Sequence, residues 1–130
     1  MAIEFQVQLE NEPGSLARLA TVLGDADVNI DAIHGRSGRM ESIVHFIPDS
    51  ADHATRVLEE AGVEFLTRDV LIVKVLDQPG MLGDVALVMS EAGINIDAVY
   101  VTTRGHVVLG VDDYDGAVQV AGGMAVMESV

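Results

Sequence analysis

The sequence predicts an α+β protein built from two ferredoxin-like βαββαβ units, each with an antiparallel sheet and two helices on one face. The first observation is an internal repeat: a shift of 66 residues lays Asn11-Glu-Pro-Gly-Ser-Leu16 over Asp77-Gln-Pro-Gly-Met-Leu82 and residues 28–32 over residues 94–98. The second is the order of strand and helix periodicities within each copy, which is the same twice. Two copies of a short unit favour a fused pair over a solenoid, which needs three or more. We place the units at residues 1–67 and 68–130.

The first copy begins with alternating apolar and polar residues, from Ile3 to Glu10, as in a strand with one face toward water. After Pro13-Gly14, Leu16, Leu19, Ala20 and Leu23 form one apolar stripe of a helix, and the second copy repeats this stripe. A hairpin follows. We expect its strands at residues 29–35 and 40–47, with turns at Arg36-Ser-Gly38 and, in the second copy, at Arg104-Gly105.

A second helix is predicted after the start signal Pro48-Asp49-Ser50, with Gly62 at its C-terminal cap position. A last strand is expected at Val63–Leu66. In the second copy the corresponding elements are shorter, with a glycine-interrupted helix at residues 115–121 and a brief strand at residues 124–130.

The charge of the chain excludes several partners. Seven basic residues against 21 acidic ones give a net charge of −14. Nucleic acids and anionic bilayers attract Lys and Arg, so this surface repels both. Well-spread carboxylates and a single lysine resemble proteins of salt-loving hosts, although an acidic protein of an ordinary cytoplasm fits as well. The N-terminal sequence does not resemble a secretion signal, and we expect a cytoplasmic protein.

Each copy has a Pro-Gly turn between its first strand and its first helix. The first amide groups of a helix lack partners and carry the positive end of its dipole, so they can hold a carboxylate without a cationic side chain. Asn11 and Asp77 precede the turns and could cap the helices. A single Pro-Gly usually only reverses the chain, but here it is duplicated. The predicted binding residues of the turns are Gly14, Ser15 and Leu16, and Gly80, Met81 and Leu82.

Polar pairs open the second strand of each copy. Asn29 and Asp31 lie two residues apart and therefore share one face of the strand, as do Asn95 and Asp97. An amide and a carboxylate together could bind the ammonium and the carboxylate of an amino acid. The same spacing also fits the polar open face of a sheet, and both interpretations stay open at this point.

These residues resemble a known family. The two Pro-Gly motifs, each followed after one helix by Val-Asn-Ile-Asp or Ile-Asn-Ile-Asp, are similar to those of ACT domains, over nearly the whole chain. The resemblance implies regulatory binding of an amino acid at an interface between ACT units whose sheets join side by side. It assigns backbone donors to the turns, a polar residue to Asn11 and Asp77, and an asparagine to Asn29 and Asn95. Asp77 departs from the asparagine form of the motif, so the two sites could differ.

No motif in the sequence indicates a catalytic reaction. The four histidines have no metal-ligand spacing, the chain has no cysteine, and no nucleotide-binding loop is present. We therefore expect neither a metal nor a cofactor, and a protein that is not an enzyme. The expected function is allosteric regulation of a metabolic enzyme or pathway by a small amino acid. The alternative is a structural or regulatory subunit of an enzyme complex with no ligand bound.

Apolar residues in the second copy also suggest self-association. Ile72 and Leu76 occupy the face that carries Gln6 and Glu10 in the first copy, and residues 106–111 are nearly all apolar. Contiguous exposed apolar surface often marks a protein interface. We therefore expect a homodimer, the simplest symmetric assembly.

Overall fold

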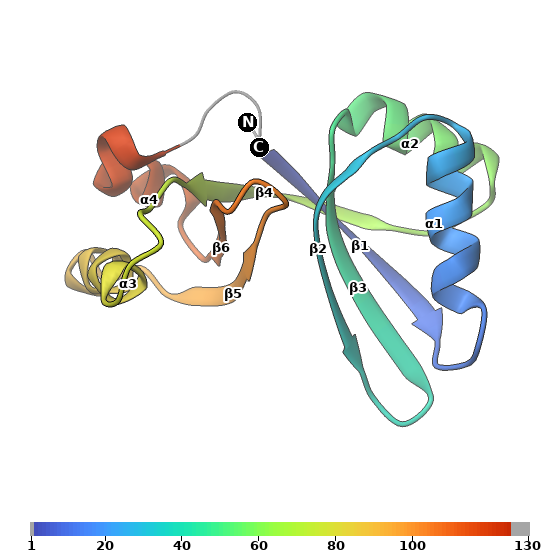
Figure 1. Ribbon diagram of the computed structural model, residues 1–130, viewed down its shortest axis with the longest axis horizontal. Coiled ribbons are helices and arrows are strands. Elements are labelled where there is room, and N and C mark those ends of the chain that lie inside the picture. The colour runs from blue at the N-terminus through green and yellow to red at the C-terminus, as the bar shows by residue number, and fades with distance from the viewer. Residues whose placement is uncertain (1, 126–130) are drawn as a thin grey trace. The chain divides into compact units, whose positions relative to one another are not determined.

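The computed structural model describes residues 2–125 and divides into two compact units (Figure 1). The first unit is Ile3–Arg68, and the second runs from Asp69 onward and includes Ala2. The first unit contains β1 (Ala2–Glu10), α1 (Ser15–Asp25), β2 (Ile30–Ser37), β3 (Glu41–Pro48) and α2 (Ala51–Glu60). Strand β4 (Leu66–Val73) passes from the first unit into the second, which continues with α3 (Met81–Glu91), β5 (Ile96–Val101), β6 (Val107–Val111), α4 (Tyr114–Ala121) and a 3-10 turn (Gly122–Met124). The predicted α+β class is confirmed, and the described elements follow the predicted order, with β4 both as the last strand of the first unit and as the first strand of the second.

The strands of each unit follow the ferredoxin-like order. In the first unit the order is β2-β3-β1-β4, and in the second it is β4-β6-β5. Strand β3 is antiparallel to both β1 and β2, and β6 is antiparallel to both β4 and β5. Because β1 and β2 therefore run in the same direction, the ends of these two strands lie at the same end of the unit. This arrangement positions the Pro-Gly turn beside the β2–β3 hairpin.

The core of the first unit is a cluster of apolar side chains between the sheet and helices α1 and α2. Phe5 is fully buried, and its ring centroid lies 5.5 Å from that of Phe46 and 5.3 Å from that of Phe65. Leu23 and Leu58, from the two helices, are also fully buried. The predicted stripe of α1 is confirmed in part: Leu19 and Leu23 pack into the core, whereas Leu16 and Ala20 are exposed.

The second unit has its own core, formed mainly by aliphatic side chains, and partly buried Tyr114 packs against it. Its buried cluster contains Leu71, Val73 and Leu109 of the sheet, together with Val85 and Met89 of α3. Its buried side chains are aliphatic apart from one flexible methionine, whereas the first cluster includes buried Phe5 and Phe46.

Polar caps start two of the helices, and the sequence predicts the first of them. The Ser50 side chain accepts a hydrogen bond from the amide of His53 at 3.3 Å, which confirms the start signal before α2. Asp113 caps α4 in the same way, by accepting from the amide of Gly116 at 3.0 Å. Gly62 follows the last turn of α2 with φ 72°, the left-handed conformation expected where a helix ends.

Several local expectations were wrong. The strand expected at Val63–Leu66 begins only at Leu66, and Phe65 just before it packs, partly buried, against the core. Glu4 lies on the predicted wet face of β1 yet is only 1% exposed. Ile72 and residues 107–111 are also buried, so they do not form the exposed apolar face that the sequence predicts. Leu76 alone of the predicted patch is well exposed, at 64%.

The C-terminal elements are confirmed in part. The helix expected at residues 115–121 is α4. Of the strand expected at residues 124–130, Met124 ends the 3-10 turn and Ala125 forms a single bridge with Val73. Residues 126–130 lie outside the described part of the chain. No helix among residues 2–125 has the length and apolar character needed to span a membrane.

Replacing Phe5 with alanine should lower the free energy of unfolding by about 3–5 kcal/mol, because the change leaves a cavity between two aromatic rings. Chemical denaturation followed by circular dichroism measures the loss. Ile33→Ala, on the exposed side of β2, is the control and should lose less than about 1 kcal/mol. Equal losses in the two variants would contradict the assignment of Phe5 to the centre of this core.

Candidate functional site

The two Pro-Gly turns have the same backbone structure. Gly14 and Gly80 are the N-caps of α1 and α3, with φ 92° and 88°, a left-handed conformation that glycine adopts without strain. Three hydrogen bonds recur at a spacing of 66 residues. The amides of Glu12 and Gln78 donate to the carbonyl two residues earlier, at 2.9 Å. The amides of Ser15 and Met81 donate to the carbonyl three residues earlier. The amides of Arg18 and Asp84 donate to the carbonyl of the glycine. The duplication therefore extends to individual backbone contacts.

A pocket adjoins each turn at equivalent positions. The first has a volume of about 300 Å³ and lies between the end of β1, the turn and the end of β2; its lining includes Glu10, Asn11, Glu12, Ser15, Leu16, Arg36, Ser37 and Ser42. The second has a volume of about 260 Å³ and is lined by Val75, Leu76, Asp77, Gln78, Met81, Leu82, Val101, Gly105 and Val107. Both volumes lie near the lower limit for ligand sites, so a small molecule fits better than a large one.

The turns leave amide donors at the helix starts. The amides of Ser15 and Met81, two of the expected donors, already donate within the turns, at 3.4 and 3.3 Å. Within residues 2–125, the hydrogen bonds of the protein give the amides of Leu16 and Leu82 no acceptor. These two amides, at the positive ends of the helix dipoles, are the donors that an anionic guest could use.

The expected helix-capping role of Asn11 and Asp77 is wrong. Neither helix has a side-chain cap, because the glycine N-caps occupy that position. The side-chain amide of Asn11 instead donates to the carbonyl of Gly38 at 3.2 Å, and its backbone amide donates to that of Met40 at 2.9 Å. Asn11 therefore ties the turn to the tip of the hairpin. Asp77 lines the second pocket, and its carboxylate has no N–H group to donate as the side-chain amide of Asn11 does.

The asparagines that open the second strands lie far from these pockets within their own unit. The side-chain amide of Asn29 donates to Asp31 at 2.7 Å, which confirms that the two share a face. The backbone amides of Asn29 and Asn95 donate to Asp49 and Asp112 at 3.1 and 3.0 Å. Along β2, Asp31 lies four positions from Gly35, the nearest strand residue of the pocket, and six positions from Ser37, or about 13 and 20 Å in an extended strand. A single unit therefore does not bring the two predicted groups together.

Two arginines near the first pocket were missed from the sequence. Arg36 lines the pocket from the end of β2. Arg18 lies over the turn: its Nη2 is 3.4 Å from the Ser15 hydroxyl and 3.5 Å from the Glu12 carboxylate. The 66-residue register could have found them, because it lays Arg18 over Asp84 and Arg36 over Thr102.

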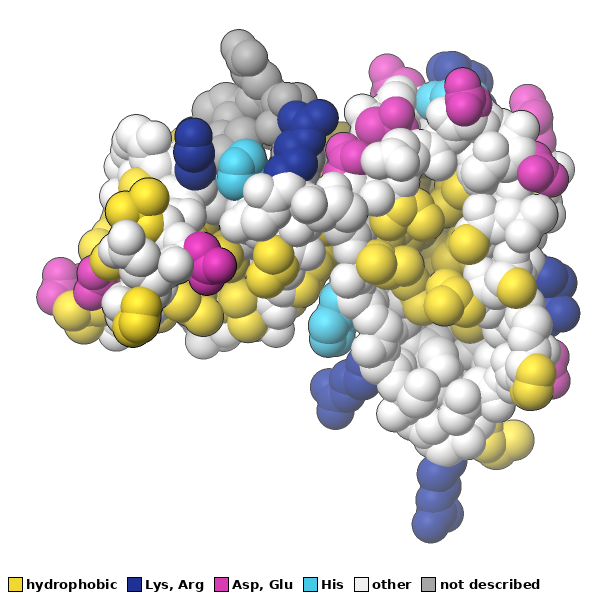
Figure 2. Space-filling model, in the orientation of Figure 1, with side chains coloured by type: hydrophobic (Ala, Val, Ile, Leu, Met, Phe, Trp, Pro, Cys, Tyr) yellow, Lys and Arg dark blue, Asp and Glu magenta, His cyan; other side chains and the backbone are white. Residues whose placement is uncertain are grey.

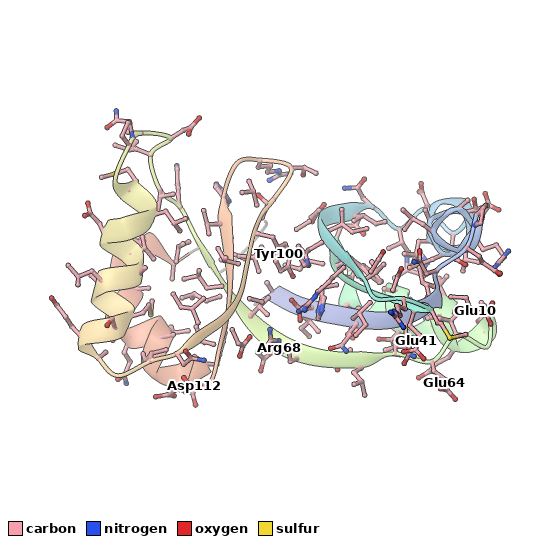
Figure 3. The ribbon with its side chains drawn as sticks, turned by 90° about the horizontal axis from the view of Figure 1, so that it is seen from below. Glu10, Glu41, Glu64, Arg68, Tyr100 and Asp112 are labelled. Atoms are coloured by element: carbon pink, nitrogen blue, oxygen red, sulfur yellow. The ribbon has the colours of Figure 1, made fainter. Side chains whose placement is uncertain are left out.

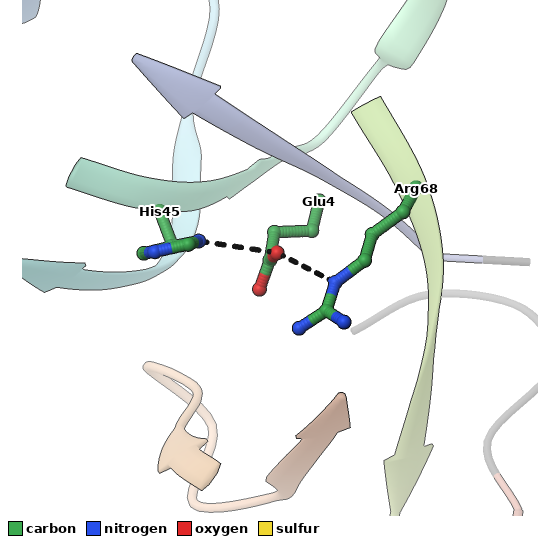
Figure 4. A network of polar contacts seen from close by, with 3 residues as sticks. All are labelled: Glu4, His45 and Arg68. Atoms are coloured by element: carbon green, nitrogen blue, oxygen red, sulfur yellow. Dashed lines mark hydrogen bonds and ion pairs between the residues drawn. The ribbon is translucent and has the colours of Figure 1, made fainter. Parts of the chain in front are cut away.

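A buried polar cluster lies on the opposite face of the first sheet (Figure 4). The Glu4 carboxylate accepts a hydrogen bond from Nε of Arg68 at 3.0 Å and lies 3.2 Å from Nδ1 of His45. The His34 ring lies beside that of His45, with the centroids 6.1 Å apart. These contacts satisfy a carboxylate that would otherwise be costly to bury, so we assign the cluster to stability.

Carboxylates are dispersed over both units instead of forming one patch, as Figure 2 shows for the face in view. One close pair lies near the first pocket: Glu10 and Glu41 are register partners at the ends of β1 and β3 (Figure 3). Among the described residues, no three histidine or acidic side chains are grouped as a metal site would require. A larger hollow of about 610 Å³ in the first unit is lined by Gln6, Gln8, Glu59, Glu64 and three apolar residues, and its carboxylates disfavour an anion.

Comparison with known proteins identifies the family. The model of the ACT domain pair matches residues 1–121, nearly the whole chain. The protein is an ACT domain pair. Among curated proteins, none matches the sequence.

Solved structures share the fold of this ACT domain pair. Protein BT0572 from Bacteroides thetaiotaomicron is 24% identical, with 92% of this chain and 85% of that chain covered and a TM-score of 0.85. The ligand-free regulatory subunit of aspartate kinase from Thermus thermophilus is 18% identical, with 92% and 89% covered and a TM-score of 0.68. The corresponding subunit from Thermus flavus is 19% identical over the same shares, with a TM-score of 0.61. The likeness confirms the tandem ferredoxin-like fold.

Replacing Gly80 with alanine should destabilise the second ACT unit by about 1–2 kcal/mol, because an L-residue is strained at φ 88° even though no atom lies within 4 Å of the added Cβ. Gly83→Ala, three residues further in the same helix, is the matched control. It also meets open space, has ordinary helical geometry, and should stabilise by about 0.5–1 kcal/mol. Thermal denaturation of the two variants measures both effects, and shifts of the same sign would contradict the assigned turn.

Proposed function

We propose that this ACT domain pair is a regulatory protein that binds a small α-amino acid at its Pro-Gly turns and modulates a metabolic enzyme or pathway. The observation that carries the proposal is the turn pocket itself, a hollow of about 300 Å³ whose lining includes Leu16, the residue with an unpaired amide at the helix start. The carboxylate of an amino acid is the anion that such a donor would hold. Membership of the ACT family supports a regulatory role.

The first pocket also offers groups for the rest of an amino acid. Glu10 and Glu12 line it together with Arg36, so groups of both signs surround the space. A carboxylate can lie near the helix start and the guanidinium, while an ammonium can lie near the glutamates. This combination suits a zwitterion better than a simple anion or a simple cation.

Regulation requires that the ligand change a conformational equilibrium. A bound amino acid shifts that equilibrium only by its difference in affinity between two arrangements of the protein. The expectation that the ligand is shared between two ACT units, with Asn29 or Asn95 and the neighbouring Asp31 or Asp97 contributing, stays a prediction. We propose no catalytic residue, metal or cofactor for this function.

A thermal-shift panel of the twenty amino acids at high salt tests the proposal. An amino acid present at a hundredfold over its Kd should add about 2.7 kcal/mol to the free energy of unfolding, and at least one should produce a clear shift. Asn29→Ala and Asn95→Ala should reduce the shift, whereas Gln119→Ala, which removes an exposed amide from α4, should not. A flat panel would favour the alternative, a structural subunit without a ligand.

We also propose that the protein is a cytoplasmic homodimer. We propose a salt-rich host as well, which the acidic, lysine-poor composition supports. Strand β5 is the last strand of the second unit's sheet, and its Val99 and Val101 are 49% and 60% exposed. An exposed apolar edge strand offers both unpaired backbone groups and apolar area to a second copy.

Sedimentation velocity should therefore detect a dimer that Val101→Lys dissociates, because a buried lysine at the edge opposes pairing. Leu87→Lys, a similar change at an exposed position of α3, is the control and should leave the dimer intact. A protein that is monomeric at every concentration would exclude this interface.

A further inference from the structure

We infer that the tip of the β2–β3 hairpin (residues 36–41) of one copy docks through Met40 into the second turn pocket of another copy. A two-fold dimer would make this contact twice, because each copy offers one tip and one pocket. The inference deepens the proposed homodimer and rests on it, since it names the segment of the second copy that meets the surface beside β5. The first pocket, which carries the amino-acid proposal, is left to the ligand.

The second turn pocket offers an apolar surface to a partner. In the 66-residue register, apolar residues of its lining replace a glutamate, a serine and a glycine of the first pocket: Leu76 lies over Glu10, Met81 over Ser15 and Val101 over Gly35. Leu76 and Val101 are 64% and 60% exposed, so the apolar lining reaches the surface. Val101 is also the last residue of β5, so the pocket adjoins the edge proposed for the dimer. An apolar side chain in this hollow of about 260 Å³ would cover surface that water otherwise contacts.

The tip of the first hairpin presents a large apolar side chain to solvent. Met40 is 82% exposed, more than any other large apolar residue in the described part of the chain. The backbone beneath it is held: the Met40 carbonyl accepts from the amide of Asn11 at 2.9 Å, and the amide of Gly38 donates to the carbonyl of Glu41 at 2.7 Å. A side chain on an anchored tip loses less freedom on docking, and methionine adapts to an irregular pocket. The equivalent residue of the second hairpin is His106, so only the first hairpin has this feature.

Charge favours a second copy of this chain as the partner. The tip contains two arginines and one glutamate, a net charge of +1, so the rest of the chain carries −14 − 1 = −15. The acidic chain therefore attracts the tip of another copy at long range. Lys74 and Arg104 adjoin residues of the pocket lining in the sequence. Asp77 in the lining and Asp84 in the first turn of α3 balance these two cations, so the surroundings of the pocket do not repel the tip.

Sedimentation velocity of single variants tests each side of the contact. Met40→Asp in the tip and Leu76→Asp in the pocket should each weaken the dimer about tenfold or more. Leu66→Asp, the same kind of change at a residue that is 67% exposed and belongs to neither surface, is the matched control and should leave the dimer as it is. Arg39→Glu should weaken the dimer more at low salt than at high salt, because salt screens the attraction. All four residues are exposed, so the variants should keep the circular dichroism spectrum of the unaltered protein.

A mixture of two variants shows whether the tip and the pocket meet each other. Met40→Asp copies keep an intact pocket and Leu76→Asp copies keep an intact tip, so a labelled Met40→Asp protein should bind Leu76→Asp protein more tightly than it binds itself. Dimers that both variants leave intact, or a mixture no tighter than the separate variants, would overturn the inference while the homodimer stands. A protein that is monomeric at every concentration would overturn the homodimer and the inference together. A flat amino-acid panel would refute the proposed ligand binding and leave this contact as it is.

Discussion

The structure of both sites depends on one backbone constraint, the left-handed glycine that begins the first helix of each unit. At φ 92° and 88°, Gly14 and Gly80 let the chain change from strand to helix within a few residues. No side chain caps either helix, so the amides of Leu16 and Leu82, two residues after the glycines, are left unpaired. A helix capped by serine or aspartate, as α2 and α4 are, would have satisfied its own donors and offered less to a guest.

The sequence predicts most of the fold because the unit occurs twice. A pattern that is ambiguous in one copy is decided by its repetition, and the later residues of both stripes are buried: Leu19 and Leu23 in α1, and Val85 and Met89 in α3. What could not be predicted depends on contacts between distant residues. The strand expected at Val63 starts only at Leu66, and the ring of Phe65 meets that of Phe5, some sixty residues earlier in the chain. The alternation of β1 predicts that Glu4 faces solvent, and only the structure shows that Arg68 and His45 contact its carboxylate.

The sequence predicts the backbone of the candidate site but not the charged side chains around it. Gly14, Leu16, Gly80 and Leu82 follow from the Pro-Gly motif alone, because glycine conformation and unpaired amides are local properties. Arg18 is separated from the turn by one helical turn, and only the three-dimensional structure shows that its guanidinium returns to the Ser15 hydroxyl. Asn11 illustrates the reverse error, since a residue type that usually caps a helix instead bonds to the hairpin tip.

Duplication with divergence has a physical consequence for how such a protein could sense a ligand. The backbone of the turn is retained in both copies, because changing it would disturb the start of a helix that carries core residues such as Leu19 and Val85. The exposed side chains around it are free of that constraint, so charge can change at little cost in stability. One copy can then keep a binding function while the other retains only its structural role. A chain with one competent pocket would respond to its ligand over the range of a single Kd, and any steeper response would have to come from association of several chains.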